Sequence, residues 1–266
     1  MLVSLLQLDR VTIRFGGLTA VSEVSATVGE HELVGLIGPN GAGKTTVFNL
    51  VTGVYQPTAG LISFGGRPTA GLKPFQLTRW GIARTFQNIR LFPSLTVFDN
   101  VRVAFHLHLK NDATHSLTRG AKFQHEEAEL RERTRALLGI FNLERVQNEP
   151  AKCLPYGDQR RLEIVRALAT SPKLLLLDEP AAGMNSTEKV ELMKLIQFIH
   201  QKFNLAILLV EHDMKVVMGI CQRIHVLEYG RKIAEGTPSE VRANPAVVAA
   251  YLGEEKVPGR VPDSSK

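Results

Sequence analysis

Short apolar segments separated by glycine-rich turns occupy the first third of the chain. Residues Leu5–Phe15 alternate between apolar and polar side chains up to a pair of glycines, which predicts a β-strand. The apolar run Glu32–Ile37 predicts another strand, and the glycine-rich segment behind it should open a helix that continues to about Val51. Leu61–Phe64, before a second glycine pair, is typical of a hairpin strand. The pattern therefore indicates an α/β core with an antiparallel β flank.

The middle of the chain, over about Gln87–Ser171, has a helical pattern. Its charged positions include the pairs Glu127–Arg131 and Glu129–Arg133, each four residues apart, and such pairs stabilise a helix surface. The apolar face of the same stretch is formed by Leu130, Leu137, Leu138 and Phe141. We therefore expect a helical subdomain inserted into the α/β core.

The β pattern returns in the last third of the chain. Four apolar runs predict strands, at Leu174–Asp178, Leu205–Val210, Ile224–Leu227 and Lys232–Ala234. Between the first two, a helix should face the core with Val190, Met193, Ile196 and Ile199. The tail Glu254–Lys266, rich in Pro, Gly, Ser and charge, predicts disorder. We expect one domain over residues 1–253, with its core at about 1–86 and 172–253 and the helical subdomain at about 87–171.

Composition narrows the class of protein without naming a function. The chain has 266 residues, 44% of them hydrophobic and 22% charged, which is ordinary for a globular domain. No apolar stretch approaches the roughly 20 residues of a membrane-spanning helix, and Met1–Leu8 predicts a strand instead of a signal peptide. Cys153 and Cys221 stand alone, so neither a disulfide framework nor a metal site is indicated, and a reducing cytosol fits. The net charge is +6, but the sequence contains no basic block of the kind typical of nucleic-acid-binding proteins.

The glycine-rich segment after the second predicted strand carries the first chemical signal. Gly38, Gly43, Lys44 and Thr45 fit the P-loop pattern G-x-x-x-x-G-K-[ST], with a strand before and a helix after it. The whole segment is Gly38, Pro39, Asn40, Gly41, Ala42, Gly43, Lys44, Thr45 and Thr46. Its amides can turn toward phosphate oxygens, while Lys44 reaches the β- and γ-phosphates and the Thr45 hydroxyl contacts Mg²⁺. A glycine-rich turn with a chance Lys-Thr is the alternative, and the motif alone specifies only a nucleotide.

A second chemical signal ends the strand Leu174–Asp178. Asp178 is suited to hold Mg²⁺ opposite Thr45. Glu179 points elsewhere and could polarise the water that attacks the γ-phosphate. The alternative is that the two acids merely begin a loop. A kinase-type P-loop enzyme would need a pocket for an acceptor substrate, and the sequence indicates none.

The two motifs are accompanied by a glutamine, a Tyr-Gly-Asp-Gln element and a histidine. Their order and spacing resemble those of the ATP-binding cassette (ABC) ATPases, and the resemblance covers residues 5–253. The resemblance implies an enzyme that hydrolyses ATP with Mg²⁺. It also implies that Gln87 contacts Mg²⁺ and links the core to the helical subdomain, that His212 contacts the γ-phosphate, and that Phe15 stacks on adenine. A surface glutamine, a loop histidine and a core phenylalanine are the alternatives.

The element from Leu154 to Gln159 resembles the signature of this family, which reaches ATP held by a second subunit. The resemblance implies that Tyr156, Gly157, Asp158 and Gln159 contact that nucleotide. This chain departs from the usual signature with Pro155 in place of Ser and Asp158 in place of Gln. Pro155 suits a helix start but offers neither a hydroxyl nor an N–H, and Asp158 brings negative charge near the partner's phosphates. We predict a pair of subunits in which this signature is the weaker half.

Three further segments resemble the LivG-type ATPase subunit of branched-chain amino acid importers: Glu179–Asn185, Glu211–Met214 and Ala250–Gly253. That resemblance implies a heterodimer with a second ABC ATPase and membrane permease subunits gripped by the segment Gln87–Val101. It further implies a periplasmic or lipid-anchored solute-binding protein and a place at the cytoplasmic face of the inner membrane. Importers of urea or other amides and lipopolysaccharide exporters share parts of the pattern, so the cargo stays open. Asn185 either contacts the partner or caps the next helix with Glu188, or does both.

Two other functional classes compete with a transport ATPase. A soluble ABC ATPase acting on nucleic acid or ribosomes usually carries two cassettes or a long coiled coil, and this sequence shows neither. A regulatory module that binds ATP without turnover would fit the irregular signature. A metal site is not expected at His106, His108, His115 and His125, which lack ligand spacing.

Overall fold

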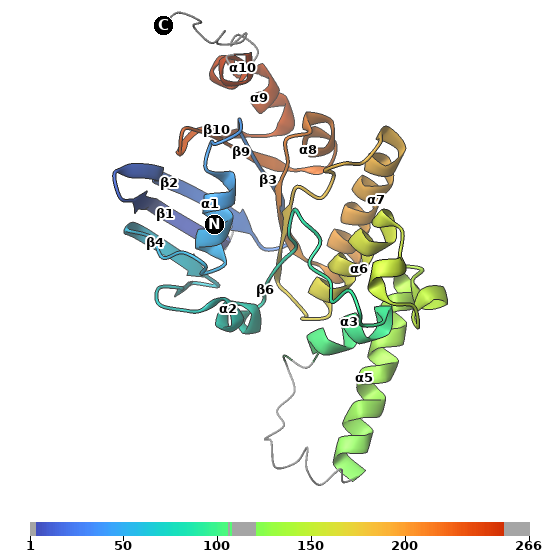
Figure 1. Cartoon of the computed structure of the whole chain (residues 1–266). Helices are drawn as coiled ribbons and strands as arrows, with labels where there is room; N and C mark the ends of the chain where they lie inside the picture. Colours follow the sequence, from blue (N-terminus) through green and yellow to red (C-terminus); the bar gives the residue numbers. More distant parts are fainter. Residues whose placement is uncertain (1–3, 106, 108–120, 253–266) are drawn as a thin grey trace, which may run out of the picture.

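The computed structural model describes residues 4–105, 107 and 121–252, and within them the strands form two sheets (Figure 1). The smaller sheet is antiparallel with the strand order β2-β1-β4-β5. The larger sheet has the order β10-β9-β3-β8-β7-β6 and is parallel except for β10. The strands are β1 (Ser4–Phe15), β2 (Leu18–Gly29), β3 (Leu33–Ile37), β4 (Ala59–Phe64), β5 (Arg67–Pro68), β6 (Ile82–Arg84), β7 (Leu174–Asp178), β8 (Ala206–Val210), β9 (Arg223–Glu228) and β10 (Arg231–Gly236).

The helices cover both faces of the larger sheet (Figure 1). The α-helices are α1 (Lys44–Val51), α2 (Pro74–Trp80), α3 (Val97–Phe105), α5 (Ala121–Ile140), α6 (Tyr156–Leu168), α7 (Ser186–Phe203), α8 (Met214–Ile220), α9 (Pro238–Ala243) and α10 (Pro245–Leu252), with the 3-10 turns η2 (Glu144–Val146) and η3 (Ala151–Cys153). No helix in the part of the chain that the structure describes combines the length and the apolar character needed to cross a membrane.

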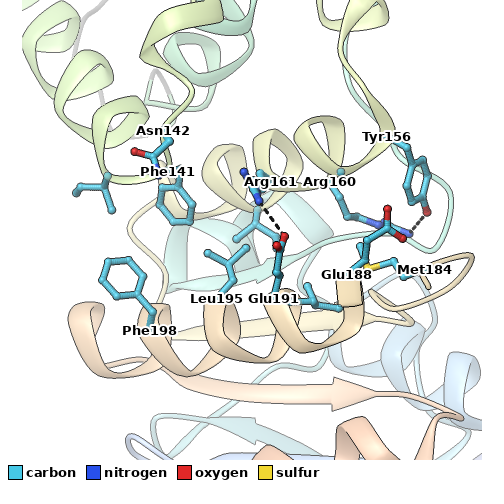
Figure 2. A pocket seen from close by; sticks show the side chains of 14 residues that line it. Phe141, Asn142, Tyr156, Arg160, Arg161, Met184, Glu188, Glu191, Leu195 and Phe198 are labelled. Atoms are coloured by element: carbon cyan, nitrogen blue, oxygen red, sulfur yellow. Dashed lines mark hydrogen bonds and ion pairs between the residues drawn. The ribbon is translucent and has the colours of Figure 1, made fainter. Parts of the chain in front are cut away.

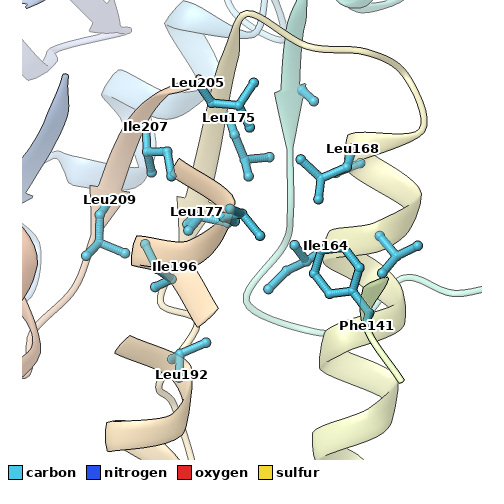
Figure 3. Close-up of a cluster of buried hydrophobic side chains, with 14 of the residues drawn as sticks. Phe141, Ile164, Leu168, Leu175, Leu177, Leu192, Ile196, Leu205, Ile207 and Leu209 are labelled. Carbon is cyan, nitrogen blue, oxygen red and sulfur yellow. The ribbon is translucent and has the colours of Figure 1, made fainter. Parts of the chain in front are cut away.

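The central strands β7 and β8 are apolar on both faces, as strands covered from two sides must be. Leu174 and Leu176 point into a cluster shared with α1 and the antiparallel sheet, whereas Leu175 and Leu177 point into a cluster shared with α6 and α7 (Figure 3). The two apolar layers meet at the sheet, so the carboxyl ends of β3, β7 and β8 are fixed relative to one another. All predicted strands are present, with bounds within two residues of the prediction.

Of the helices between β6 and β7, α6 packs against one face of the larger sheet, whereas α5 extends away from the sheet (Figures 1 and 3). Leu130, Leu137, Leu138 and Phe141 are buried, and both predicted ion pairs form, Glu127–Arg131 at 3.4 Å and Glu129–Arg133 at 3.9 Å. The expectation of helix from residue 87 onward was wrong at its start, because residues 87–96 form a loop. The buried Asn100 side chain holds that loop by donating to three of its carbonyls. The division at 1–86, 87–171 and 172–253 stays a prediction.

The prediction that Val190 faces the core was wrong. Its side chain is 50% exposed, whereas Leu192, Ile196 and Ile199 form the buried stripe of α7. Successive helix positions turn by about 100°, so a residue two places before Leu192 lies on the far side of the helix. Met193 is half-buried beside the stripe. The predicted tail, with His106, His108 and His115, lies outside the described residues, and His125 is exposed.

Candidate nucleotide-binding and hydrolysis site

The P-loop turns from β3 into α1 through backbone conformations that only glycine accepts without strain. Gly38 has φ 152°, and a Cβ there would lie 2.1 Å from the carbonyl oxygen of Leu227. Gly43 has φ 99°, and a Cβ there would lie 2.9 Å from the carbonyl oxygen of Ala20. Packing against β2 and β9 therefore fixes the loop at both ends. This rigid turn presents its amides at the N-terminus of α1, which favours an anionic ligand.

Lys44 and Thr45 occupy the first turn of α1 behind this loop. The Lys44 side chain is buried, and its ammonium donates to the carbonyl oxygens of Gly38 at 2.6 Å and Pro39 at 2.9 Å. Thr45 is exposed. The loop thus encloses a cation within its own turn and leaves a hydroxyl at its surface, a combination suited to phosphates and a metal ion.

Asp178 ends β7 and forms an ion pair that the sequence analysis missed. Its Oδ2 accepts from Arg84 of β6 at 2.7 Å, and the two side chains are only 7% and 10% exposed. Arg84 also donates to Asn49 Oδ1 at 2.7 Å, and its guanidinium lies over the rings of Phe48 and Phe86. The available signal was a single charged residue at the end of the apolar segment Ile82-Ala83, because a buried arginine needs a counter-charge.

Glu179 meets Gln87 and His212 beside the end of β7. The Gln87 amide donates to Glu179 Oε2 at 2.7 Å, and His212 Nδ1 lies 3.7 Å from the same oxygen. Glu179 itself has φ 45°, in the left-handed region that a non-glycine residue occupies at a cost of about 1–3 kcal/mol. The structure therefore brings together three residues that are up to 125 positions apart in the chain, with Glu179 held in a strained conformation.

Glu211 holds the two loops that carry this cluster, a role that the sequence did not predict. Its side chain is completely buried, and its carboxylate accepts from the Ala181 amide at 2.7 Å and the His212 amide at 3.2 Å. Burial raises the pKa of Glu211, although these backbone donors oppose the shift. One carboxylate thus fixes both the loop after Glu179 and the start of the loop that carries His212. The sequence signal for this role is an acidic residue that stands between the apolar run of β8 and His212.

Phe15 lies at the end of β1 and is 44% exposed, which excludes a core role. Its ring packs edge-on against Tyr55, with centroids 5.1 Å apart and planes at 71°. Two half-exposed aromatic rings form an apolar surface of the kind on which a base can stack. Contact of Phe15 with adenine stays a prediction.

The signature element lies at the start of α6. Pro155 is the N-cap residue, one position before the helix, and not within its first turn. Tyr156 is 46% exposed and Gly157 has open space where a side chain would stand. Asp158 is buried and accepts from Arg145 at 3.3 Å and Arg161 at 3.5 Å. The charge that the sequence analysis expected near a partner's phosphates is therefore paired within this chain.

The remaining predicted side chains are held locally. The Gln159 amide donates to the Leu154 carbonyl at 2.8 Å. Asn185 is the N-cap of α7, where its side chain accepts from the Thr187 and Glu188 amides while Glu188 accepts from the Asn185 amide. The capping interpretation of Asn185 is confirmed, and a contact with a partner stays a prediction.

The chain is similar to known proteins over most of its length. A family model described as ABC transporter matches residues 21–182, and one described as Branched-chain amino acid ATP-binding cassette transporter matches residues 231–257. The chain is 49% identical to the high-affinity branched-chain amino acid transport ATP-binding protein LivG of Salmonella typhimurium, across 94% of this chain and 98% of that protein. BraF of Pseudomonas aeruginosa, with the same description, is 47% identical over the same shares. The lipopolysaccharide export system ATP-binding protein LptB of Escherichia coli K12 is 34% identical, across 91% and 94%.

Solved structures show the same fold. The chain superposes on MJ1267, an ATP-binding cassette of an ABC transporter in its ADP conformation, with a TM-score of 0.81 and 28% identity, covering 94% of this chain and 99% of that one. A dimeric post-hydrolysis structure of the cassette MJ0796, bound to ADP and Pi, gives a TM-score of 0.72 at 27% identity, covering 88% and 98%. The predicted α/β fold with an antiparallel flank is confirmed.

Proposed function

Since the chain belongs to the ABC transporter family, we propose that it hydrolyses ATP to drive the import of branched-chain amino acids. The cluster of Gln87, Glu179 and His212 beside the P-loop strand is the observation that carries the activity. The cargo is supported by the relatives LivG and BraF and by the family match over residues 231–257. LptB is more distant, so lipopolysaccharide export is the weaker candidate.

ATP binding follows from the P-loop geometry. The amides of the loop receive the phosphates, and Lys44 supplies positive charge from inside the turn. Thr45, Gln87 and Asp178 offer hydroxyl, amide and carboxylate oxygens, which are ligands that suit Mg²⁺, so these residues would hold the metal. When bound, Mg²⁺ neutralises charge on the phosphate oxygens. Arg84 orients the Asp178 carboxylate from the side of β6.

Hydrolysis needs a base that faces the attacking water. Glu179 fills that role in the proposal, because the Gln87 amide fixes one of its oxygens and directs the carboxylate. His212 lies beside the same oxygen, on the neighbouring loop. In this proposal it contacts the γ-phosphate from that position. Glu211 keeps the two loops in register by holding a backbone amide of each.

The position of the signature supports a working unit of two ATPase subunits. The helices α1 and α6 lie on opposite faces of the larger sheet (Figure 1). Phe48 of α1 packs into the cluster between the sheets, whereas Ile164 of α6 packs into the cluster on the other face (Figure 3). The exposed Tyr156 and Gly157 therefore serve the nucleotide of a second subunit, which in this proposal is a different ABC ATPase. The exposed Asn185 end of α7 lies at the same surface.

A groove of about 470 Å³ beside the loop that bears Gln87 suits a permease segment. Phe92 and Val103 are 48% and 42% exposed there, and Arg90 and Arg166 stand among the aromatic rings. Apolar side chains with a cationic rim favour a loop of a membrane subunit over nucleic acid. The chain would then lie at the cytoplasmic face of the inner membrane and meet the solute-binding protein only through the permease.

Reconstitution tests the proposal. The chain, a partner ABC ATPase and permease subunits of a branched-chain amino acid importer are placed in liposomes that contain ATP, and uptake of radiolabelled leucine is measured with the solute-binding protein outside. We expect leucine uptake with ATP turnover, and loss of both in the Glu179→Gln variant. Uptake of urea or amides with no leucine transport would refute the cargo, and turnover that survives Glu179→Gln would refute the assigned base.

A further inference from the structure

A buried ion pair lies in the signature helix, outside the residues assigned so far. Arg160 and Glu163, one turn apart on α6, are joined at 2.9 Å, and their side chains are only 2% and 1% exposed. Such a pair contributes little net stability unless every polar atom finds a partner. All of its polar atoms except Arg160 Nε find partners, most of them in the loop that carries Gln87.

Arg160 and Glu163 hold that loop by its backbone. One guanidinium nitrogen of Arg160 donates to the Phe86 carbonyl and the other to the Gln87 carbonyl, both at 2.6 Å. Glu163 Oε1 accepts from the Phe86 and Arg90 amides, each at 3.3 Å. Two adjacent carbonyls match the fixed fork of a guanidinium, which a lysine ammonium cannot reproduce.

The same arginine is connected to the signature surface. The guanidinium nitrogen that bonds the Gln87 carbonyl lies 3.3 Å from the hydroxyl of Tyr156 (Figure 2). That hydroxyl donates to the Ala182 carbonyl at 3.2 Å. Ala182 belongs to the loop directly after Glu179. Arg160 is therefore bonded to the backbone of Gln87, whose side chain contacts Glu179, and to a residue that the partner subunit would cover.

We propose that Arg160 is a positioning residue that sets Gln87 against Glu179 in response to pairing at the signature. A guanidinium buried this deeply cannot release its carbonyl partners cheaply, so the start of α6 and the loop of Gln87 move together. When a partner subunit presses on Tyr156, the displacement reaches the amide that orients the base of this chain's own site. Occupancy of the partner's nucleotide site thus controls hydrolysis here, an inference that rests on the proposed pairing.

The test compares Arg160→Lys with Arg131→Lys in the reconstituted complex. Arg131 is a matched control, because it is an exposed arginine on a neighbouring helix, paired only with Glu127 in the described contacts. We expect Arg160→Lys to lower kcat on the order of 10- to 100-fold with little change in the KM for ATP, since a misplaced group costs turnover. ATP-dependent pairing should stay near that of Arg131→Lys, whereas the melting temperature should fall below that of Arg131→Lys because a buried carbonyl loses its donor. Tyr156→Phe should lower kcat by less.

Hydrogen exchange supplies a readout independent of turnover. In Arg160→Lys, the amides of Phe86 and Arg90 should exchange faster, while those of the α6 interior keep their protection. An unchanged kcat in Arg160→Lys, or a loss of ATP affinity and pairing in proportion to kcat, would overturn the inference. Failure of the unmodified complex to pair or to hydrolyse ATP would instead refute the proposed function.

Discussion

Replacing Arg84 with methionine should destabilise the protein strongly, because it leaves the Asp178 carboxylate buried without its counter-charge. The two side chains are 10% and 7% exposed and lie 2.7 Å apart. Removing one partner of such a pair typically costs about 3–5 kcal/mol. Domains have a total stability of about 5–15 kcal/mol, so the loss is a large share of what holds this fold together.

Urea unfolding measures this loss, followed by circular dichroism and by the fluorescence of the chain's single tryptophan, Trp80. Asp178→Asn and the double variant complete a thermodynamic cycle with Arg84→Met. Because the double variant buries no unpaired charge, we expect it to be more stable than the sum of the single losses by about 1–3 kcal/mol.

Arg131→Met is the control for this cycle, since its ion pair is an exposed helix pair worth about 0.3–0.5 kcal/mol. A stability loss in Arg84→Met no larger than in this control would refute a stabilising buried pair. Losses at Arg84 and Asp178 that add to within about 0.5 kcal/mol would also refute it, because independent sites behave in that way.

Three further changes test other parts of the structure. Asn185→Ala removes the cap of α7 and should lower the unfolding free energy, measured by urea unfolding, by about 1 kcal/mol. An unchanged unfolding free energy would contradict the capping role of Asn185. The pKa of Glu235 lies at about 2, below its usual value of 4.5. Burial raises this pKa, but hydrogen bonds from Lys232 and Arg223 and the charge of His225 lower it by more. Its stabilisation is present above pH 4.5 and should fade as the pH falls toward 2. Glu235→Gln should therefore lower the unfolding free energy at neutral pH and make it fall less steeply between pH 4.5 and 2, measured by urea unfolding across that range. Pro155→Ser adds a hydroxyl that can bond a partner's phosphate, worth roughly 1.5–3 kcal/mol, so ATP-dependent pairing should tighten by one to two decades or turnover should rise; no change in either means that Gly157 and the helix end suffice.

The sequence predicts the parts of the fold in which an apolar run ends at residues with a recognisable chemical role. The strand Leu174–Asp178 and the turn from β3 into α1 were predicted because their side chains alone indicate both burial and function. The strand β2, over Leu18–Gly29, was not predicted, since eight of its twelve positions are polar or small and only its pairing with β1 makes it a strand. The strand β6 was missed because its three residues are too few to show a pattern without β7 beside them.

The candidate site shows a similar division. Motifs predicted Gln87, Glu179 and His212 as separate residues, and the structure shows that a single carboxylate oxygen joins them. Arg84 and Arg160 escaped because a buried arginine has no local pattern, and its role depends on partners at distant positions. Asp158 was expected to carry charge to the surface, but two arginines that pair with it become visible only once the helix and the turn before it are packed.

The placement of α1 and α6 on opposite faces of the larger sheet has a kinetic consequence. In the proposed pairing the signature of this chain serves the nucleotide of the other ATPase, so in a mixture of the two purified subunits the rate of ATP hydrolysis should grow with the product of their concentrations until the pairs have formed. Dilution below the pairing constant should then silence an enzyme whose residues are all intact. In the membrane, two ATPases fastened to one permease would be held permanently at high local concentration, so anchoring would itself switch the activity on.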